Sequence, residues 1–112
     1  MNYMLLILDD VKAQAKLPKA EMDRLVRSHG TFYKMLKAKG KLVMGQRLRP
    51  EISRVVLRKG APQVMDGPFA ETREFLGGFY LIRCKDRAEA LEWARRCPIL
   101  PGDAIEVRPV WE

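Results

Sequence analysis

Several residue patterns that mark common classes of protein are missing from this chain of 112 residues. It has one histidine and two cysteines, and the spacing of Cys84 and Cys97 is not that of a zinc site. Neither G-x-G-x-x-G nor a loop ending in G-K-S or G-K-T occurs, which excludes the usual phosphate-binding loops. We therefore expect no metal and no cofactor, and we interpret both cysteines as small buried hydrophobic residues.

Long apolar runs are missing as well. The longest uncharged apolar run, Tyr3 to Leu8, is far shorter than the roughly 20 residues that a membrane-spanning helix needs. Only Met1 and Asn2 precede it, so the basic stretch that opens a signal peptide is not found there. These features predict a cytoplasmic location and no membrane partner. In that reducing compartment a disulfide between the two cysteines is unneeded.

Basic residues are in excess. The chain carries 21 Lys and Arg against 14 Asp and Glu, which gives a formal net charge of +7. Such a balance raises the hypothesis of nucleic acid or another polyanion as partner. However, no five consecutive residues are basic, and the charges are scattered along the chain. We interpret them as solvated surface charges, which makes a nucleic-acid partner the weaker hypothesis.

Hydrophobic periodicity predicts both helices and strands. The run Tyr3 to Leu8 is typical of a strand that is buried on both faces and central in its sheet. Apolar residues three and four positions apart predict a helix between Pro18 and Gly40. A second helix is predicted over residues 87–96. The other predicted strands are residues 41–48, 53–58, 63–65, 78–84 and 105–111.

The order of these elements predicts the fold. Without the hairpin of residues 53–65, the chain reads strand-helix-strand-strand-helix-strand, the ferredoxin-like split βαβ pattern of the α+β class. We therefore expect one domain over residues 1–112 with an inserted β-hairpin. Two helices cover only one face of such a sheet, so the other apolar face needs a cover. The simplest cover is the same face of a second copy of the chain, which predicts a homodimer with its sheets packed face to face.

Local packing explains the stretch from Asp66 to Phe79 least well. It holds three glycines, a proline, three acids and three phenylalanines between two apolar runs. Gly77 and Gly78 weaken a strand at its start, which predicts a β-bulge there or the close approach of another backbone or a ligand. Asp66, before Gly67 and a proline, is explained by turn formation, with a carboxylate aimed into a pocket as the alternative.

Several motifs of the chain occur together, and in this order, in a known family. They are Tyr3-Met4-Leu5-Leu6-Ile7, Leu48-Arg49-Pro50, Asp66-Gly67-Pro68-Phe69-Ala70-Glu71-Thr72, Leu76-Gly77-Gly78-Phe79-Tyr80-Leu81-Ile82, Ala90-Leu91-Glu92-Trp93-Ala94 with Cys97-Pro98, and Glu106-Val107-Arg108-Pro109-Val110. Over nearly its whole length the chain resembles the DGPF branch of the YCII-related family. The resemblance implies a dimeric α/β-barrel architecture. Members are often encoded beside extracytoplasmic-function sigma factors, which implies a regulatory setting.

The resemblance also implies a candidate dyad. Relatives in the wider family are proposed to pair a histidine on the first helix with an aspartate just before the proline that ends the second helix. The histidine falls on His29, but the aspartate position is occupied by Cys97, before Pro98. Half of the dyad is therefore present, and Asp66, Asp9 or Asp10 could replace the other half if the fold brings it near His29.

The sequence thus offers a short set of candidate site residues. His29 is either a core residue bonded to a carbonyl or a general acid or base, since imidazole titrates near neutral pH. Its acidic partner would be Asp66 or Glu74. Arg47 could hold an anionic group, although a surface arginine is the plainer interpretation. The candidate catalytic residues are His29 and Asp66, and the candidate ligand-binding residues are Phe69, Glu74, Arg47 and Trp93.

Two functions are compatible with these residues. The first is a small homodimeric ligand-binding protein or enzyme, with acid/base chemistry in a pocket formed by the first helix, the sheet and the loop of residues 66–78. The second is a non-catalytic regulatory or interaction module linked to a sigma factor. A pocket with a titratable pair would favour the first, and a filled core with an exposed apolar patch would favour the second.

Overall fold

The computed structural model describes residues 1–67, 69 and 73–112. Its main sheet has four antiparallel strands in the order β2-β5-β1-β6. With the helices α2 and α3 this is the strand order of a ferredoxin-like fold, which confirms the α+β prediction. The elements are β1 (Asn2–Asp10), α1 (Val11–Ala15), α2 (Lys19–Ala38), β2 (Leu42–Arg47), β3 (Ser53–Arg58), β4 (Ala61–Asp66), β5 (Glu74–Arg83), α3 (Arg87–Arg96) and β6 (Ala104–Pro109).

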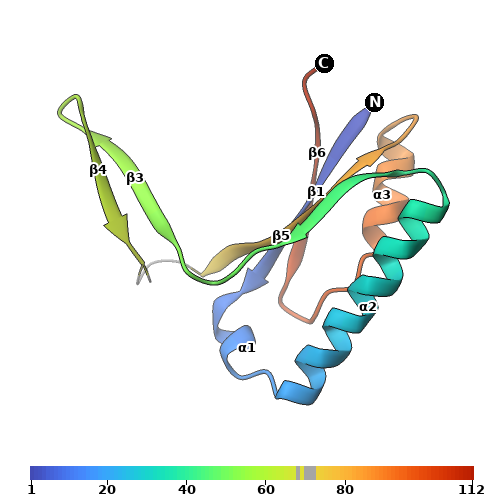
Figure 1. Ribbon diagram of the computed structural model, residues 1–112, viewed down its shortest axis with the longest axis horizontal. Helices are drawn as coiled ribbons and strands as arrows, with labels where there is room; N and C mark the ends of the chain where they lie inside the picture. The colour runs from blue at the N-terminus through green and yellow to red at the C-terminus, as the bar shows by residue number, and fades with distance from the viewer. Residues whose placement is uncertain (68, 70–72) are drawn as a thin grey trace.

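Both long helices lie on one face of the sheet (Figure 1). Strand β1 turns Tyr3, Leu5 and Ile7 toward them, and these side chains are buried. From α2, Phe32 and Leu36 meet this face and complete the centre of the core. The remaining buried core residues are Tyr80, Ile82, Cys84, Ala90, Trp93 and Cys97.

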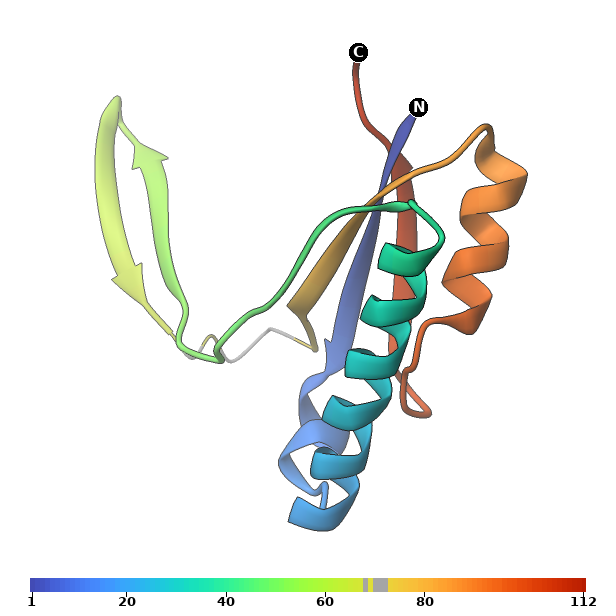
Figure 2. The same ribbon diagram turned by 45° about the vertical axis from the view of Figure 1, so that its right-hand side comes forward.

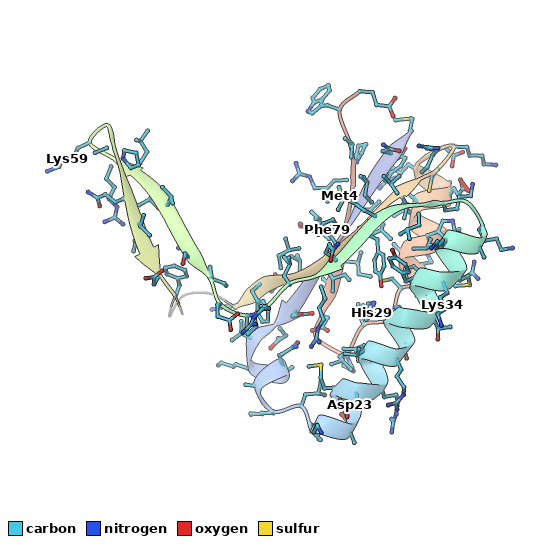
Figure 3. All side chains as sticks on the ribbon, viewed as in Figure 1. Met4, Asp23, His29, Lys34, Lys59 and Phe79 are labelled. Atoms are coloured by element: carbon cyan, nitrogen blue, oxygen red, sulfur yellow. The ribbon has the colours of Figure 1, made fainter. Side chains whose placement is uncertain are left out.

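On the opposite face of the sheet, the described residues form no helix (Figure 2). Strand β1 pairs with β5 on one side and β6 on the other, so its predicted central place is confirmed. Because side chains alternate along a strand, Met4, Leu6 and Leu8 lie on the open face and are only partly buried. Figure 3 shows Met4 and Phe79 on the side of the sheet away from α2.

Local signals explain where the helices begin and end. The Asp86 carboxylate accepts a hydrogen bond from the Glu89 backbone N–H at 2.9 Å, as expected of an N-cap. At the end of α2, Gly40 takes the positive φ of 70° that favours glycine. A short helix, α1, forms where a plain connector was expected, and Asp10 caps it by accepting from Ala13 N–H at 2.9 Å.

Strands β3 and β4 form a hairpin that stands away from the sheet, and we call it the arm (residues 53–66) (Figure 1). Its turn places Lys59 and Gly60 at positive φ, as a two-residue hairpin turn requires. One face of the arm exposes Val55, Leu57 and Val64 by 64%, 74% and 71%. The arm also lengthens the molecule: its radius of gyration is 15.8 Å, against about 13 Å for a compact chain of this length.

Both cysteines are buried and free, which confirms the interpretation of them as small core residues. Trp111 lies after the last strand and is 99% exposed, so it is not part of this chain's core. Among the described residues, no helix is both long enough and apolar enough to cross a bilayer. Residues 68 and 70–72 of the loop motif lie outside the described residues.

Candidate functional site

A cavity of about 270 Å³ lies between the N-terminal half of α2 and the sheet, and we call it the α2 cavity. Helix α2 lines it with a stripe of residues three and four positions apart, and strands β1, β2 and β5 supply the facing wall. His29 comes from the middle of that stripe and projects from the side of α2 that faces the sheet (Figure 3). The lining residues are Ile7, Asp9, Gln14, Met22, Leu25, Val26, His29, Gly30, Tyr33, Gly45, Gln46, Arg47, Gly77, Gly78 and Tyr80.

Glycines explain why this end of the layer is hollow. Gly45, Gly77 and Gly78 all line the cavity from the strand side and present no side chain to it. A Cβ atom on Gly78 would lie 2.9 Å from the backbone oxygen of Gln46, and one on Gly45 would lie 2.8 Å from the Tyr80 ring. Gly78 therefore allows the backbones of β2 and β5 to lie close together, and Gly45 leaves room for the Tyr80 ring.

Gly77 also makes a place for Asp9. Along the pairing of β1 with β5, Ile7 faces Gly78 but Leu8 faces Leu76, so Gly77 is the extra residue of a β-bulge. A Cβ atom on Gly77 would collide with the Asp9 carboxylate. The predicted bulge is confirmed at Gly77, and the predicted close approach of another backbone is confirmed at Gly78. The group that approaches Gly77 is a carboxylate side chain, which the prediction did not include.

Asp9 continues the inward-facing series of β1 that ends at Ile7, so its carboxylate points to the helix side of the sheet. Partial burial raises its pKa to about 6, and the nearby negative charge of Asp103 adds to this rise. The positive charge of Arg47 works in the opposite direction and favours the ionised carboxylate. Asp9 therefore changes protonation close to neutral pH, which an ordinary aspartate does not.

His29 is held from two sides. Its Nδ1 lies 2.8 Å from the Tyr80 hydroxyl, and the two rings stack with centroids 5.9 Å apart. Burial lowers the pKa of the imidazole, Arg47 lowers it further, and a hydrogen bond with the backbone of Pro98 opposes both effects. The imidazole is therefore neutral at pH 7, and its ring orientation is fixed.

Arg47 and Arg49 differ sharply in their partners. Arg49 forms two hydrogen bonds to the Glu51 carboxylate, at 3.0 and 2.8 Å. Arg47 lines the α2 cavity, and the contact of its guanidinium is with the sulfur of Met22 at 3.5 Å, a weak acceptor. Among the described residues, Arg47 forms no salt bridge with a carboxylate. Its donors are therefore available to a ligand in the cavity.

The structure places Asp66 elsewhere. Asp66 lines a second cavity, of about 530 Å³, at the base of the arm, together with Phe69 and Phe75. Its carboxylate accepts a hydrogen bond from the Ser53 hydroxyl at 2.6 Å across the arm. The guanidinium of Arg54 lies 3.8 Å from the centre of the Phe69 ring. Asp66 and His29 therefore line different cavities of the chain.

With this geometry in place, comparison with known proteins identifies the family. The family model described as YCII-related domain matches residues 1–112, the whole chain. The chain belongs to the YCII-related family. It is also similar to Uncharacterized protein R00369 of Rhizobium meliloti (strain 1021), with 40% identity over 97 residues, which cover 85% of this chain and 78% of that protein.

In this YCII-related protein the position expected for the dyad aspartate is a buried thiol. Cys97 is 4% exposed, and burial raises its pKa to about 12, so it stays protonated at neutral pH. It cannot act as the carboxylate partner of His29. The carboxylate that shares a cavity with His29 is that of Asp9, which enters from the other end of the sequence.

Two further candidate residues of this YCII-related chain, Trp93 and Glu74, lie outside both cavities. Trp93 is 6% exposed and packs edge-on against Phe32 in the core, away from both cavities. Glu74 is exposed at the start of β5, opposite Asp10, and lines neither cavity. Of the six candidate residues, only His29 and Arg47 line the α2 cavity. Within residues 1–67, 69 and 73–112, no group of three or more His, Cys, Asp or Glu could hold a metal ion.

Proposed function

We propose that the α2 cavity binds a small molecule and that Asp9 exchanges a proton with it. The observation that carries this proposal is a carboxyl group in a ligand-sized hollow with a pKa near 6. A general base or acid works best when its pKa lies near the working pH. Groups with strongly shifted pKa values in a cavity are typical of functional sites.

His29 has a supporting role in this proposal. Its neutral imidazole and the Asp9 carboxylate are both proton acceptors at pH 7, because the pKa of His29 is lowered and that of Asp9 is about 6. With the Tyr80 hydroxyl at Nδ1 and the Pro98 backbone as its second partner, the His29 ring holds one wall of the cavity in place, while Asp9 is the group whose protonation changes most readily.

The test is an NMR titration of the His29 ring and the Asp9 carboxyl in the wild type and in Arg47→Gln. We expect His29 to titrate below its usual 6.5 and Asp9 near 6 in the wild type. Because the Arg47 charge lowers the pKa of both groups, its removal should raise both. His29 is the only histidine, so its ring signals need no further assignment.

Two variants serve as controls for this titration. Arg49→Gln removes the same charge two residues away from the cavity, and Asp66→Asn removes the carboxylate of the second cavity. Neither should change the titration of His29 or Asp9. Ordinary pKa values for both groups, unchanged by Arg47→Gln, would contradict an acid/base site in the α2 cavity.

We also propose that the chain forms a homodimer through the open face of its sheet. On this face Leu81 lies opposite Met4, and Phe79 lies opposite Leu6, so apolar side chains adjoin across two central strands. A second copy would cover them by the face-to-face packing that two sheets adopt. Phe79→Glu should convert the dimer to a monomer in sedimentation velocity, with its circular dichroism unchanged.

An interaction module is the second candidate function, and the arm is the feature that favours it. Val55 and Val64 are directly paired, and Leu57 follows on the same face, so three exposed apolar side chains adjoin. Leu57→Glu should leave a sheet-mediated dimer intact.

Two outcomes would change this assignment. A wild type that sediments as a monomer would contradict the homodimer. A dimer that is lost in Leu57→Glu but kept in Phe79→Glu would assign the dimer contact to the arm.

A further inference from the structure

The walls of the α2 cavity differ in chemical character. Met22, Leu25 and Val26 make the N-terminal part of the α2 side apolar, and His29 and Tyr33 follow farther along the helix. The aspartate and the arginine come from the opposite side, where strands β1 and β2 contribute Asp9 and Arg47. A ligand that fits both sides has an apolar body and one polar end. With a volume of about 270 Å³, the cavity is at the small end of ligand sites.

The charges on the polar side select the sign of that end. Arg47 is the cation of the cavity lining, and among the described residues it has no carboxylate partner. The planar guanidinium presents two parallel N–H donors, a geometry that matches a carboxylate. Arg49 shows the pairing that this side chain adopts when a carboxylate is in reach, since it holds Glu51 with two hydrogen bonds.

Asp9 would be expected to repel an anion, but its environment removes this obstacle. The charged groups that act on it are Arg47 on β2 and Asp103 before β6, and His29 on α2 lines the same cavity. A negative charge brought to Arg47 adds to the effect of Asp103 and raises the pKa of Asp9 above its value of about 6. Asp9 then takes up a proton and can donate a hydrogen bond to the bound anion.

We propose that the α2 cavity takes a small monocarboxylate with an apolar body, which sits with its carboxylate on Arg47 and binds together with a proton on Asp9. This inference rests on the proposed function of the cavity as a ligand site. It adds the class of ligand and the linkage of binding to protonation. Its two signatures are a preference for anions that depends on Arg47 and an affinity that rises as the pH falls.

Three probes that share a benzyl group test the preference: phenylacetate, phenylacetamide and benzylamine, which are anionic, neutral and cationic. Binding is followed by NMR from the backbone amides of Gly45, Gly77 and Gly78 and from the His29 ring. We expect phenylacetate to bind about tenfold more tightly than phenylacetamide, because an ionised partner strengthens the hydrogen bonds to Arg47. Arg47→Gln should abolish this preference, and the matched Arg49→Gln should preserve it.

Calorimetry in two buffers of different ionisation enthalpy tests the proton. Phenylacetate binding at pH 7 should take up most of a proton in the wild type and much less in Asp9→Asn. Equal affinity for phenylacetate and phenylacetamide, tighter binding of benzylamine, or the absence of any cavity shift with phenylacetate would each overturn the inference. These outcomes are separate from the titration of Asp9 and His29 without ligand, which tests the proposed function by itself.

Discussion

The two halves of helix α2 lie over the same sheet, yet one half is packed and the other is hollow. In the C-terminal half, Phe32 and Leu36 are 2% and 0% exposed and meet large side chains such as Tyr80 and Trp93. In the N-terminal half, residues of the same apolar character, such as Leu25, line a cavity. The helical stripe is continuous, so the helix is not the source of the difference.

The difference comes from the sheet. Beneath the packed half, β5 presents Tyr80 and Ile82, which fill the layer. Beneath the hollow half, β5 and β2 present Gly77, Gly78 and Gly45, which do not. A helix pattern therefore predicts which face is turned inward, but the partner surface decides whether that face becomes core or cavity.

The largest effect is expected for a truncation in the packed half. Leu36→Ala removes a side chain with no exposure and should lower the free energy of unfolding by about 2–5 kcal/mol, because it leaves a cavity in the core. The same change in the hollow half, Leu25→Ala, should cost about 1 kcal/mol, since this side chain is only partly buried. Urea denaturation of both variants measures the comparison, and equal losses would show that the two halves are packed alike.

A smaller effect is expected when a methyl group is added to the hollow half. Gly77→Ala places a Cβ atom on the Asp9 carboxylate, so Asp9 must move, and the loss of stability should be about 1–3 kcal/mol. The pKa of Asp9 should fall back toward 3.8 as the carboxylate moves into water.

Gly30→Ala is the matched control for this change. A Cβ atom on Gly30 meets nothing within 4 Å, and alanine in mid-helix is about 1 kcal/mol more favourable than glycine. Gly30→Ala should therefore raise the free energy of unfolding, and the NMR titration of Asp9 should not change. An unchanged Asp9 pKa in Gly77→Ala would mean that Gly77 does not position the carboxylate.

The smallest effects are those of pH on stability, and the two titrating groups of the hollow half should act in opposite directions. The pKa of Asp9 is raised in the folded state, so the folded state holds more protons and stability falls as the pH rises from about 4 through 6. The pKa of His29 is lowered, so stability falls as the pH drops below 6.5. Asp9 is partly exposed, so its contribution should be about 1 kcal/mol after solvent screening.

Single substitutions separate these two contributions. Asp9→Asn should remove the fall in stability between pH 4 and 6, and His29→Asn should remove the fall below pH 6.5. The packed half supplies the control, because Leu36→Ala should shift the whole pH profile without changing its shape. Because the two contributions oppose each other, the wild-type profile alone does not test them; a profile that neither substitution changes would contradict the shifted pKa values of both groups.

Much of the fold could be predicted from the residues because the signals were local. The apolar run from Tyr3 to Leu8 identified the central strand, and Asp86 marked the start of α3. The pair Lys59 and Gly60 allowed the tight turn of the arm. For the site, the sequence left several acidic partners for His29: Asp66 or Glu74 first, with Asp9 or Asp10 as alternatives. Asp66 lines the cavity at the base of the arm, whereas Asp9 lines the α2 cavity.

Two signals used together favour Asp9 among these acidic residues. The first signal is side-chain alternation: Asp9 points to the same face of β1 as Tyr3, Leu5 and Ile7. The second is a pair of adjacent glycines in another strand, which leave room for a side chain against their backbone. The missing information was the pairing of β1 with β5, which sets Asp9 beside Gly77. No local pattern contains that register, since the two residues are far apart in the sequence.

The sequence by itself therefore determined the class of fold, the order of its elements and the inward faces of the helices, because these follow from periodicity, caps and turn residues. Only the tertiary structure decided that Asp9, His29 and Arg47 share one cavity while Asp66 lies in another. The physical reason is that a cavity is defined by what long-range pairing leaves unfilled. Here a β-bulge and three glycines leave that space, and two titratable groups and an arginine line it.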